Sequence, residues 1–269
     1  MMQDWPGTLV IVGCGNMGGA MLAGWLAGGL DPERVTVVDP VLESVPPGVT
    51  LLRDAGEATA PQAVLLGVKP QMLGDLAPGL AHLAAAGTTV LSILAGAELA
   101  TLKRLFPDAS GHVRIMPNLA AAIGKSPVAL ASSGLDEAGR AAVTAMMQPL
   151  GTPLWIGEDL FDAVTALTGS GPAFVYRFID ALAGAASALG MDAEQARVLA
   201  LAMTEGAALL AASSPDAPGE LADKVASPGG TTRAGLDVLD KDQALVGLVA
   251  DTLRAARDRS AEMARESAG

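Results

Sequence analysis

The feature that most constrains the fold is a cluster of glycines directly after a short apolar segment near the start of the chain. Residues 9–12 read Leu-Val-Ile-Val, and Gly13–Gly18 then read Gly-Cys-Gly-Asn-Met-Gly, which fits the pattern G-x-G-x-x-G. A strand that turns sharply into a helix needs glycines for the tight turn and for the close approach of helix and strand. The pattern therefore predicts a βαβ unit that starts at this first strand.

Short apolar runs alternate with helix-like segments up to about residue 157. Several runs are apolar throughout, as expected of parallel strands that are covered on both faces. The alternation predicts a doubly wound parallel sheet of the Rossmann type, in an α/β fold. We expect strands at Thr8–Val12, Val35–Val38, Ala63–Leu66, Thr89–Leu94, His112–Met116, Val128–Ala131 and Pro153–Ile156, and helices at Met17–Ala27, Met72–Ala86 and Asp136–Gln148.

Beyond residue 157 the strand-like runs end and Ala- and Leu-rich helical segments take over. The sequence therefore predicts two domains, a dinucleotide-binding Rossmann domain over residues 1–157 and an all-helical substrate and dimerisation domain over residues 158–269. The expected helices of the second domain are Phe161–Leu167, Pro172–Leu189, Ala193–Ala212, Thr232–Leu239 and Lys241–Ala264.

The charge balance and the scarcity of metal ligands limit the partners of this chain. It carries 17 Lys and Arg against 29 Asp and Glu, a formal net charge of −12. Because no basic stripe offsets this charge, we do not expect a nucleic-acid partner. Cys14 is the single cysteine, so the chain can form no intramolecular disulfide. This cysteine and the two histidines do not have the spacing of metal ligands. We therefore expect no metal and a reducing, cytoplasmic location.

The uncharged segment Gly7–Leu30 is long enough to resemble a membrane span. Glycine recurs throughout it and Asn16 lies within it, whereas the residues before it lack the basic leader of a secretory signal. No other segment combines such length with uniform apolarity. We therefore expect a soluble protein with no membrane partner.

The glycine cluster and one acidic residue together indicate a dinucleotide site. Free N–H groups and the dipole at the start of the expected helix suit phosphate groups. Asp39 follows the second expected strand, where an acidic residue accepts hydrogen bonds from ribose hydroxyls. Its carboxylate would repel the 2′-phosphate of NADPH, and the next arginine is Arg53. The residues therefore favour NADH, which we expect to be used at least as well as NADPH.

Further motifs occur in a fixed order along the chain and are more specific than the glycine pattern. Together they resemble the pyrroline-5-carboxylate reductases, the enzymes of the last step of proline synthesis, from Leu9 to about Leu239. The motifs are Gly67–Pro70 (Gly-Val-Lys-Pro), Ser92–Gly96 (Ser-Ile-Leu-Ala-Gly), Arg114–Asn118 (Arg-Ile-Met-Pro-Asn), Asp162–Phe174 and Ser227–Leu236.

This resemblance implies an NAD(P)H-dependent oxidoreductase that reduces L-1-pyrroline-5-carboxylate to L-proline. It also implies a helical domain that interlocks with a second subunit, in a homodimer or a ring of dimers. By position, the cofactor would lie against Gly13, Gly15, Asn16, Met17, Gly18, Val68, Lys69, Pro70 and Ala95, and the substrate against Glu158, Ser227, Gly229, Gly230, Thr231 and Thr232.

The last motif offers chemistry that suits this substrate. The run Ser227–Gly230 leads into a helix that we expect Thr231 or Thr232 to cap, and glycines at a helix start form a backbone anion site for a carboxylate. The Thr232 hydroxyl could then hydrogen-bond the imine nitrogen and act as the catalytic residue. The chain departs from the family at Leu119-Ala120, where Thr-Pro is usual, and at Asp39 and Asp54 near the expected ribose.

Two alternatives remain open at this point. The β-hydroxyacid dehydrogenases also pair a glycine-rich domain with a helical one, but their lysine and asparagine positions hold Val175 and Phe178 in this chain. A dinucleotide-binding protein without catalytic activity would keep the same fold. The intact run from Ser227 to Thr232 argues against this second alternative.

Overall fold

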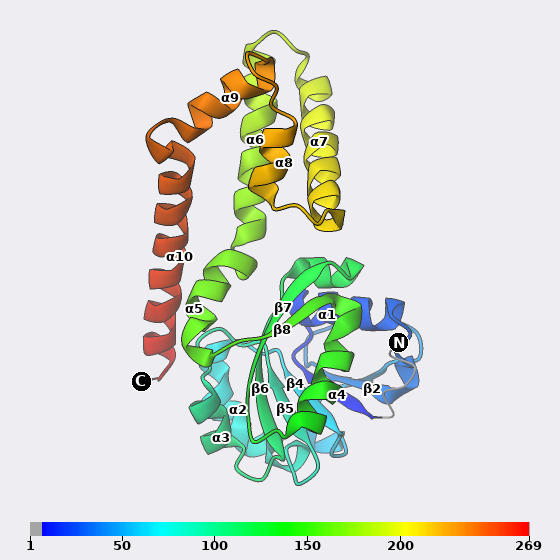
Figure 1. Ribbon diagram of the computed structural model, residues 1–269. Helices are drawn as coiled ribbons and strands as arrows, with labels where there is room; N and C mark the ends of the chain where they lie inside the picture. The colour runs from blue at the N-terminus through cyan, green and yellow to red at the C-terminus, as the bar shows by residue number, and fades with distance from the viewer. Residues whose placement is uncertain (1–6, 269) are drawn as a thin grey trace. The chain divides into compact units, whose positions relative to one another are not determined.

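A computed structural model describes residues 7–268, whose contacts divide the chain into two compact units (Figure 1). The first unit runs to Gly169 and also includes the end of the chain from Ala256. The second unit is Ser170–Ala255.

The sequence predicts a boundary at residue 157, whereas segment 158–169 belongs to the first unit. Phe161 explains the difference, because its side chain is 2 % exposed and packs within the apolar core on one face of the sheet. The Asn118 amide also donates to the Thr168 carbonyl over 3.0 Å. Both contacts attach the start of the helical sequence to the first unit.

The first unit is built on one sheet of eight strands in the order β3-β2-β1-β4-β5-β6-β7-β8. The chain moves from β1 outward to β3 and then returns to β4 on the other side of β1. In such sheets this reversal leaves a crevice at the carboxyl ends of the strands, where ligands bind. The strands are β1 (Leu9–Val12), β2 (Val35–Val38), β3 (Thr50–Leu52), β4 (Ala63–Leu66), β5 (Thr89–Ser92), β6 (Gly111–Met116), β7 (Ser126–Ser133) and β8 (Gly151–Trp155).

Helices cover both faces of this sheet, which is why its central strands are apolar throughout (Figure 1). Successive residues of β1 point to opposite faces, so Ile11 packs in the core that contains Trp25, and Val12 in the core that contains Leu80. The first core is formed with α1 (Asn16–Ala27) and α4 (Glu137–Met147), and the second with α2 (Leu73–Leu80) and α3 (Leu99–Leu105). The segment Gly7–Leu30 is therefore a strand and a helix, not a continuous span.

The expected strands are all present, but the sheet differs from the prediction in two respects. The edge strand β3 was not expected, because its three residues are too few to show a periodic pattern. In addition, β6 and β7 pair antiparallel, whereas the other neighbouring strands are parallel. The link between them contains only the short 3₁₀ segment η6 (Leu119–Ile123). Because a parallel crossover needs a dozen or more residues, this link is too short for β7 to run parallel to β6.

The second unit and its flanks are helical, as the sequence predicts. One helix, α8, was not expected, since it begins at Pro218 within a run that resembles a loop. By length and composition α7 could cross a membrane, contrary to the expectation from the sequence, and little of it is buried. The elements are α5 (Phe161–Val164), the π-helical turn η9 (Thr165–Gly169), α6 (Gly171–Ala188), α7 (Ala193–Ser213), α8 (Pro218–Lys224), α9 (Thr231–Asp240) and α10 (Ala244–Ala268).

Candidate active site

The glycine loop lies at the carboxyl end of β1, where the strand order reverses. Gly13 N donates to the Val38 carbonyl of β2 over 2.9 Å, and Gly67 N donates to the Val12 carbonyl over 2.8 Å. The loop is therefore held between the ends of β2 and β4. This is the crevice at which a doubly wound sheet binds its ligand.

Close packing accounts for two of the three pattern glycines. Gly13 has a φ of +82°, and a Cβ there would lie 2.8 Å from Val68 N. A Cβ on Gly18 would lie 3.1 Å from the Gly13 carbonyl oxygen, so the helix packs tightly on the loop. A Cβ on Gly15 would meet no atom within 4 Å, so this residue faces open space.

The start of α1 provides the donors that a phosphate needs. Its N-cap is Gly15, which has no side chain to hydrogen-bond the first N–H groups of Asn16, Met17 and Gly18. These donors meet at the open side of Gly15, and the helix dipole adds partial positive charge there. The residues present therefore fit the pyrophosphate of a dinucleotide.

The motif after β4 lies beside this loop, as expected. A Cβ on Gly67 would be only 2.4 Å from the Gly13 carbonyl oxygen, so a glycine is required for this approach. Val68 adjoins Gly13, and Lys69 and Pro70 follow directly. Ala95 lies in the loop after β5, whose carboxyl end is next along the sheet. Direct contact of these residues with a cofactor stays a prediction.

A cavity of about 300 Å³ opens beside the glycine loop. Most of its walls are apolar, which suits a flat heterocycle such as adenine. Its polar side chains belong to Arg53 and Asp54, which directly follow β3. The lining residues are Val12, Gly13, Val38, Pro40, Arg53, Asp54, Ala55, Val68, Met72, Leu76, Gly79 and Leu80.

Asp39 has a structural role that the sequence did not predict. Its Oδ2 accepts a hydrogen bond from Cys14 N over 3.0 Å, and its Oδ1 accepts from Val41 N and Leu42 N over 2.9 and 3.0 Å. Burial alone would raise the pKa of this carboxyl, but the three N–H donors and the Arg53 guanidinium lower it below its ordinary value. The residue is 7 % exposed, and its expected contact with a ribose stays a prediction.

Cys14 is unsuited to redox chemistry in this setting. Its side chain is 6 % exposed, and burial together with the nearby Asp39 carboxylate raises the pKa of the thiol to about 11. A thiol with so high a pKa forms little of the reactive thiolate near neutral pH. The residue serves the loop through its backbone N–H.

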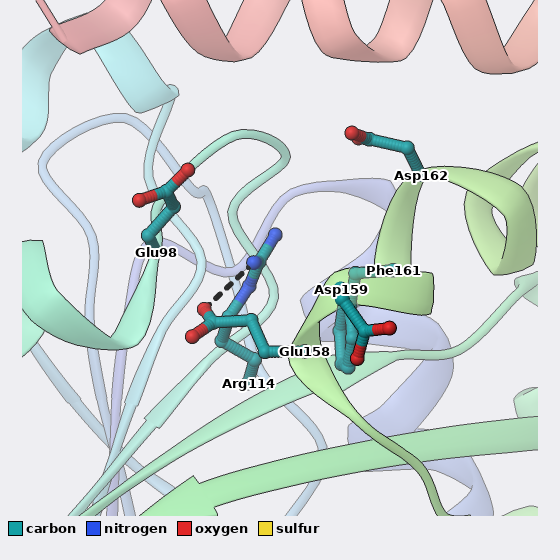
Figure 2. A pocket seen from close by; sticks show the side chains of 6 residues that line it. All are labelled: Glu98, Arg114, Glu158, Asp159, Phe161 and Asp162. Atoms are coloured by element: carbon teal, nitrogen blue, oxygen red, sulfur yellow. Dashed lines mark hydrogen bonds and ion pairs between the residues drawn. The ribbon is translucent and has the colours of Figure 1, made fainter.

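Glu158, which was expected near the substrate, lies in an acidic pocket of about 270 Å³ within the first unit (Figure 2). Its Oε1 accepts from Arg114 Nη1 over 2.8 Å and from Leu99 N over 2.7 Å, and the guanidinium lies 4.4 Å from the centre of the Phe161 ring. Four carboxylates and one guanidinium line this pocket, a charge balance that disfavours an anionic ligand. The pocket is lined by Glu98, Arg114, Glu158, Asp159, Phe161 and Asp162.

Glu158 therefore ties three elements together, and its contact with a substrate stays a prediction.

No group of three or more His, Cys, Asp or Glu positioned for a metal ion occurs among residues 7–268.

The run Ser227–Gly230 forms a tight turn at the start of α9, in the second unit. Gly230 N donates to the Ser227 carbonyl over 2.9 Å, and Gly229 adopts a φ of +70°. The expected cap is wrong, because the N-cap is Gly230 and not Thr231 or Thr232. The helix α9 therefore begins at Thr231, so both threonines lie in its first turn.

This arrangement leaves the start of α9 open to a ligand. The N-cap supplies no side-chain hydrogen bond to the first N–H groups of the helix. Thr231 and Thr232 are exposed, and among the described residues neither hydroxyl forms a hydrogen bond within the protein. Backbone donors and a free hydroxyl therefore occur together, as an anionic ligand with a polar ring atom requires.

A glycine loop at the switch point of a Rossmann sheet, followed by a helical unit, is typical of nicotinamide-dinucleotide-dependent oxidoreductases. Comparisons with known proteins agree. The family model described as NADP oxidoreductase coenzyme F420-dependent matches residues 8–96, and the one described as pyrroline-5-carboxylate reductase dimerisation matches residues 158–263.

Individual relatives extend the match over nearly the whole chain. A pyrroline-5-carboxylate reductase from Methanosarcina acetivorans is 33 % identical and aligns with 95 % of this chain and 97 % of its own. Its counterpart from Aquifex aeolicus is 38 % identical over 86 % of this chain and 88 % of its own. The solved pyrroline-5-carboxylate reductase of Coxiella burnetii, 29 % identical, covers 95 % of this chain and 97 % of its own with a TM-score of 0.88. The chain therefore belongs to the pyrroline-5-carboxylate reductase family.

Arg53, which the sequence placed too far from Asp39 to affect the dinucleotide site, lies beside that residue in the fold. It lies well beyond Asp39 along the chain, but β2 and β3 pair parallel with Val38 opposite Leu52. Asp39 and Arg53 are therefore each the first residue after neighbouring strands. The short strand before Arg53 was the available signal, and its three residues were too few to be noticed.

Proposed function

We propose that the protein reduces the C=N bond of L-1-pyrroline-5-carboxylate to give L-proline, with NADPH or NADH as the hydride donor. The observation that carries this proposal is family membership over nearly the whole chain, together with a glycine loop whose open side fits a pyrophosphate. The reduced nicotinamide supplies the hydride, and the protein supplies binding, orientation and electrostatic support. A β-hydroxyacid dehydrogenase is not favoured, because the positions of the lysine and the asparagine of that class hold Val175 and Phe178 in this chain.

The start of α9 is the proposed substrate side of the reaction. Its first backbone N–H groups would bind the substrate carboxylate, with Ser227, Gly229 and Gly230 forming the turn that exposes them. Thr232 would donate a hydrogen bond to the ring nitrogen. Because that nitrogen gains electron density as hydride arrives, this hydrogen bond strengthens in the transition state.

We also propose that the functional form is a homodimer or a ring of dimers in the cytoplasm. Large apolar side chains are exposed along α7, among them Leu199 at 56 % and Leu210 at 63 %. The family model that covers this helix is described as a dimerisation region. A partner subunit that covers these side chains also accounts for the apolar character of α7 without a membrane.

The reaction is tested by following the loss of reduced-nicotinamide absorbance with L-1-pyrroline-5-carboxylate, once with NADPH and once with NADH, and by identifying the product chromatographically. We expect turnover that depends on the substrate and yields L-proline. A protein that binds the dinucleotide but oxidises it with no substrate-dependent rate would contradict the proposal and indicate the catalytically silent alternative.

Thr232 provides a sharper test of the proposed site. Thr232→Ala should lower turnover by roughly 10- to 1000-fold, the range expected for one positioned donor, and Thr232→Ser should restore most of it. Dinucleotide affinity should hardly change in either variant. Thr252→Ala is the matched control, because its hydroxyl donates only to the Leu248 carbonyl within α10, over 2.8 Å. Full turnover in Thr232→Ala would show that the hydroxyl has no catalytic role.

A further inference from the structure

Arg53 occupies a place in the fold where the adenosine ribose of a dinucleotide would lie. The parallel register sets Val38 opposite Leu52, and Asp39 N donates to the Leu52 carbonyl over 3.1 Å. Arg53 therefore follows β3 at the point where Asp39 follows β2. In Rossmann folds the residues at this edge distinguish a ribose 2′-hydroxyl from a 2′-phosphate.

The guanidinium of Arg53 is held in position by backbone carbonyls. Its Nη1 donates to the Asp39 carbonyl over 3.0 Å and also to the Leu42 carbonyl. The residue is nonetheless exposed and lines the cavity beside the glycine loop. A guanidinium has five N–H donors, so one nitrogen can be anchored while the others remain directed outward. Such an arrangement reduces the entropy lost when an anion binds.

The carboxylates close to Arg53 are already engaged by backbone donors. Asp39 accepts three N–H hydrogen bonds and is 7 % exposed, so its charge is largely compensated from within the protein. Asp54 accepts from Gly56 N over 2.8 Å and caps a short 3₁₀ turn. Neither forms an ion pair with Arg53 among the residues that the structure describes. Arg53 is also the one basic residue that lines this cavity in the described part of the chain.

We propose that Arg53 is the specificity-determining residue of the dinucleotide site and binds the 2′-phosphate of NADPH. A planar guanidinium matches a phosphate in charge and in hydrogen-bond geometry, whereas a ribose hydroxyl gains much less from it. The inference rests on the proposed function, because it names the hydride donor that the reaction would select. It replaces the preference for NADH that Asp39 alone suggested, since Arg53 is adjacent to Asp39 in the fold.

The test compares the dissociation constants of NADPH and NADH, measured by the change in their own fluorescence without any substrate. Arg53→Met should raise the NADPH constant about 10- to 100-fold and the NADH constant less than about twofold. Arg53→Lys should give an intermediate loss, because it keeps the charge but not the planar fork. Arg34→Met is the matched control. It removes the same charge at the opposite end of β2, where Arg34 pairs with Asp31 over 3.6 Å, and should leave both constants unchanged.

A second measurement uses the unaltered protein and does not depend on the variants folding. Adenosine 2′,5′-bisphosphate should compete with NADPH more strongly than adenosine 5′-monophosphate does, and this advantage should shrink as salt is added. Equal losses of NADPH and NADH in Arg53→Met would overturn the proposal and assign Arg53 to loop stability alone. Equal competition by the two nucleotides would overturn it as well. Tight, Arg53-dependent NADPH binding without reduction of the substrate would refute the proposed reaction but leave this inference intact.

Discussion

At the scale of single residues, Asp39 shows how one side chain can organise a binding loop. Its carboxylate joins the glycine loop, through Cys14 N, to the turn after β2, through Val41 N and Leu42 N. These hydrogen bonds favour the charged form and lower the pKa of Asp39 in the folded protein, although burial opposes them. The residue therefore stabilises the glycine loop and the turn after β2.

The lowered pKa of Asp39 makes this contribution sensitive to pH in a definite direction. A carboxyl whose pKa is lower in the folded than in the unfolded chain stabilises the fold above its unfolded pKa of about 3.9, and this stability is lost as pH falls below that value. Urea unfolding of the wild type should thus show stability falling on acidification from pH 5 towards pH 3. Asp39→Asn should be less stable at neutral pH by about 1–2 kcal/mol and show a smaller acid-induced loss. An unchanged acid-induced loss in this variant would rule out a role for Asp39.

At the scale of elements, the buried guanidinium of Arg114 joins β6 to two neighbouring segments. Glu158 of the turn before α5 accepts from Arg114 (Figure 2). It also accepts from Leu99 N at the start of α3. The Arg114 side chain is 9 % exposed and that of Glu158 is 33 % exposed, so the pair is only partly screened by water. Removing one partner leaves the other charge poorly compensated.

A double-mutant cycle measures this link. Arg114→Met should destabilise the fold by about 2–4 kcal/mol, because it leaves Glu158 without its cation and removes the contact with the Phe161 ring. Glu158→Gln should cost less, because an amide oxygen can still accept from Leu99 N. The two losses should be markedly non-additive in urea unfolding. Additive losses would show that the two side chains contribute independently.

At the scale of the whole molecule, the second unit exposes more apolar surface than a single chain would be expected to leave in water. The exposed side chains on α7 include Leu199 and Leu210, and others lie on α6, such as Phe178 at 48 %. An interface of a stable dimer buries surfaces of this kind.

We predict that the wild type sediments as a dimer or larger assembly at micromolar concentration. Leu199→Glu combined with Leu210→Glu should shift it towards monomer, because each places an unpaired charge in an apolar interface. Leu154→Glu is the matched control, since Leu154 is 64 % exposed on β8 of the first unit and should leave the assembly unchanged. A monomeric wild type in light scattering would refute the proposed homo-oligomer.

Much of the first unit could be predicted from the sequence, because its signals are local. Strand and helix periodicity is set by neighbouring residues, so seven strands and the helices α1, α2 and α4 were located without tertiary information, whereas the short helix α3 was not. The glycine pattern was equally informative, since a Cβ on Gly13 would collide with the backbone of Val68 and a Cβ on Gly18 would press against the Gly13 carbonyl oxygen. Family motifs added the proposed substrate loop at Ser227–Thr232, which no periodic pattern would have revealed.

Other features were decided only by the tertiary structure, because they depend on contacts between residues far apart in the chain. The register of β3 on β2 brings Arg53 beside Asp39, and no local pattern marks so short a strand. The hydrogen bonds that engage Asp39 come from the glycine loop and from its own turn, so its side chain alone suggested a different role. Local sequence determined which elements form in this protein, whereas the packing of those elements decided which charged groups remain available to a ligand.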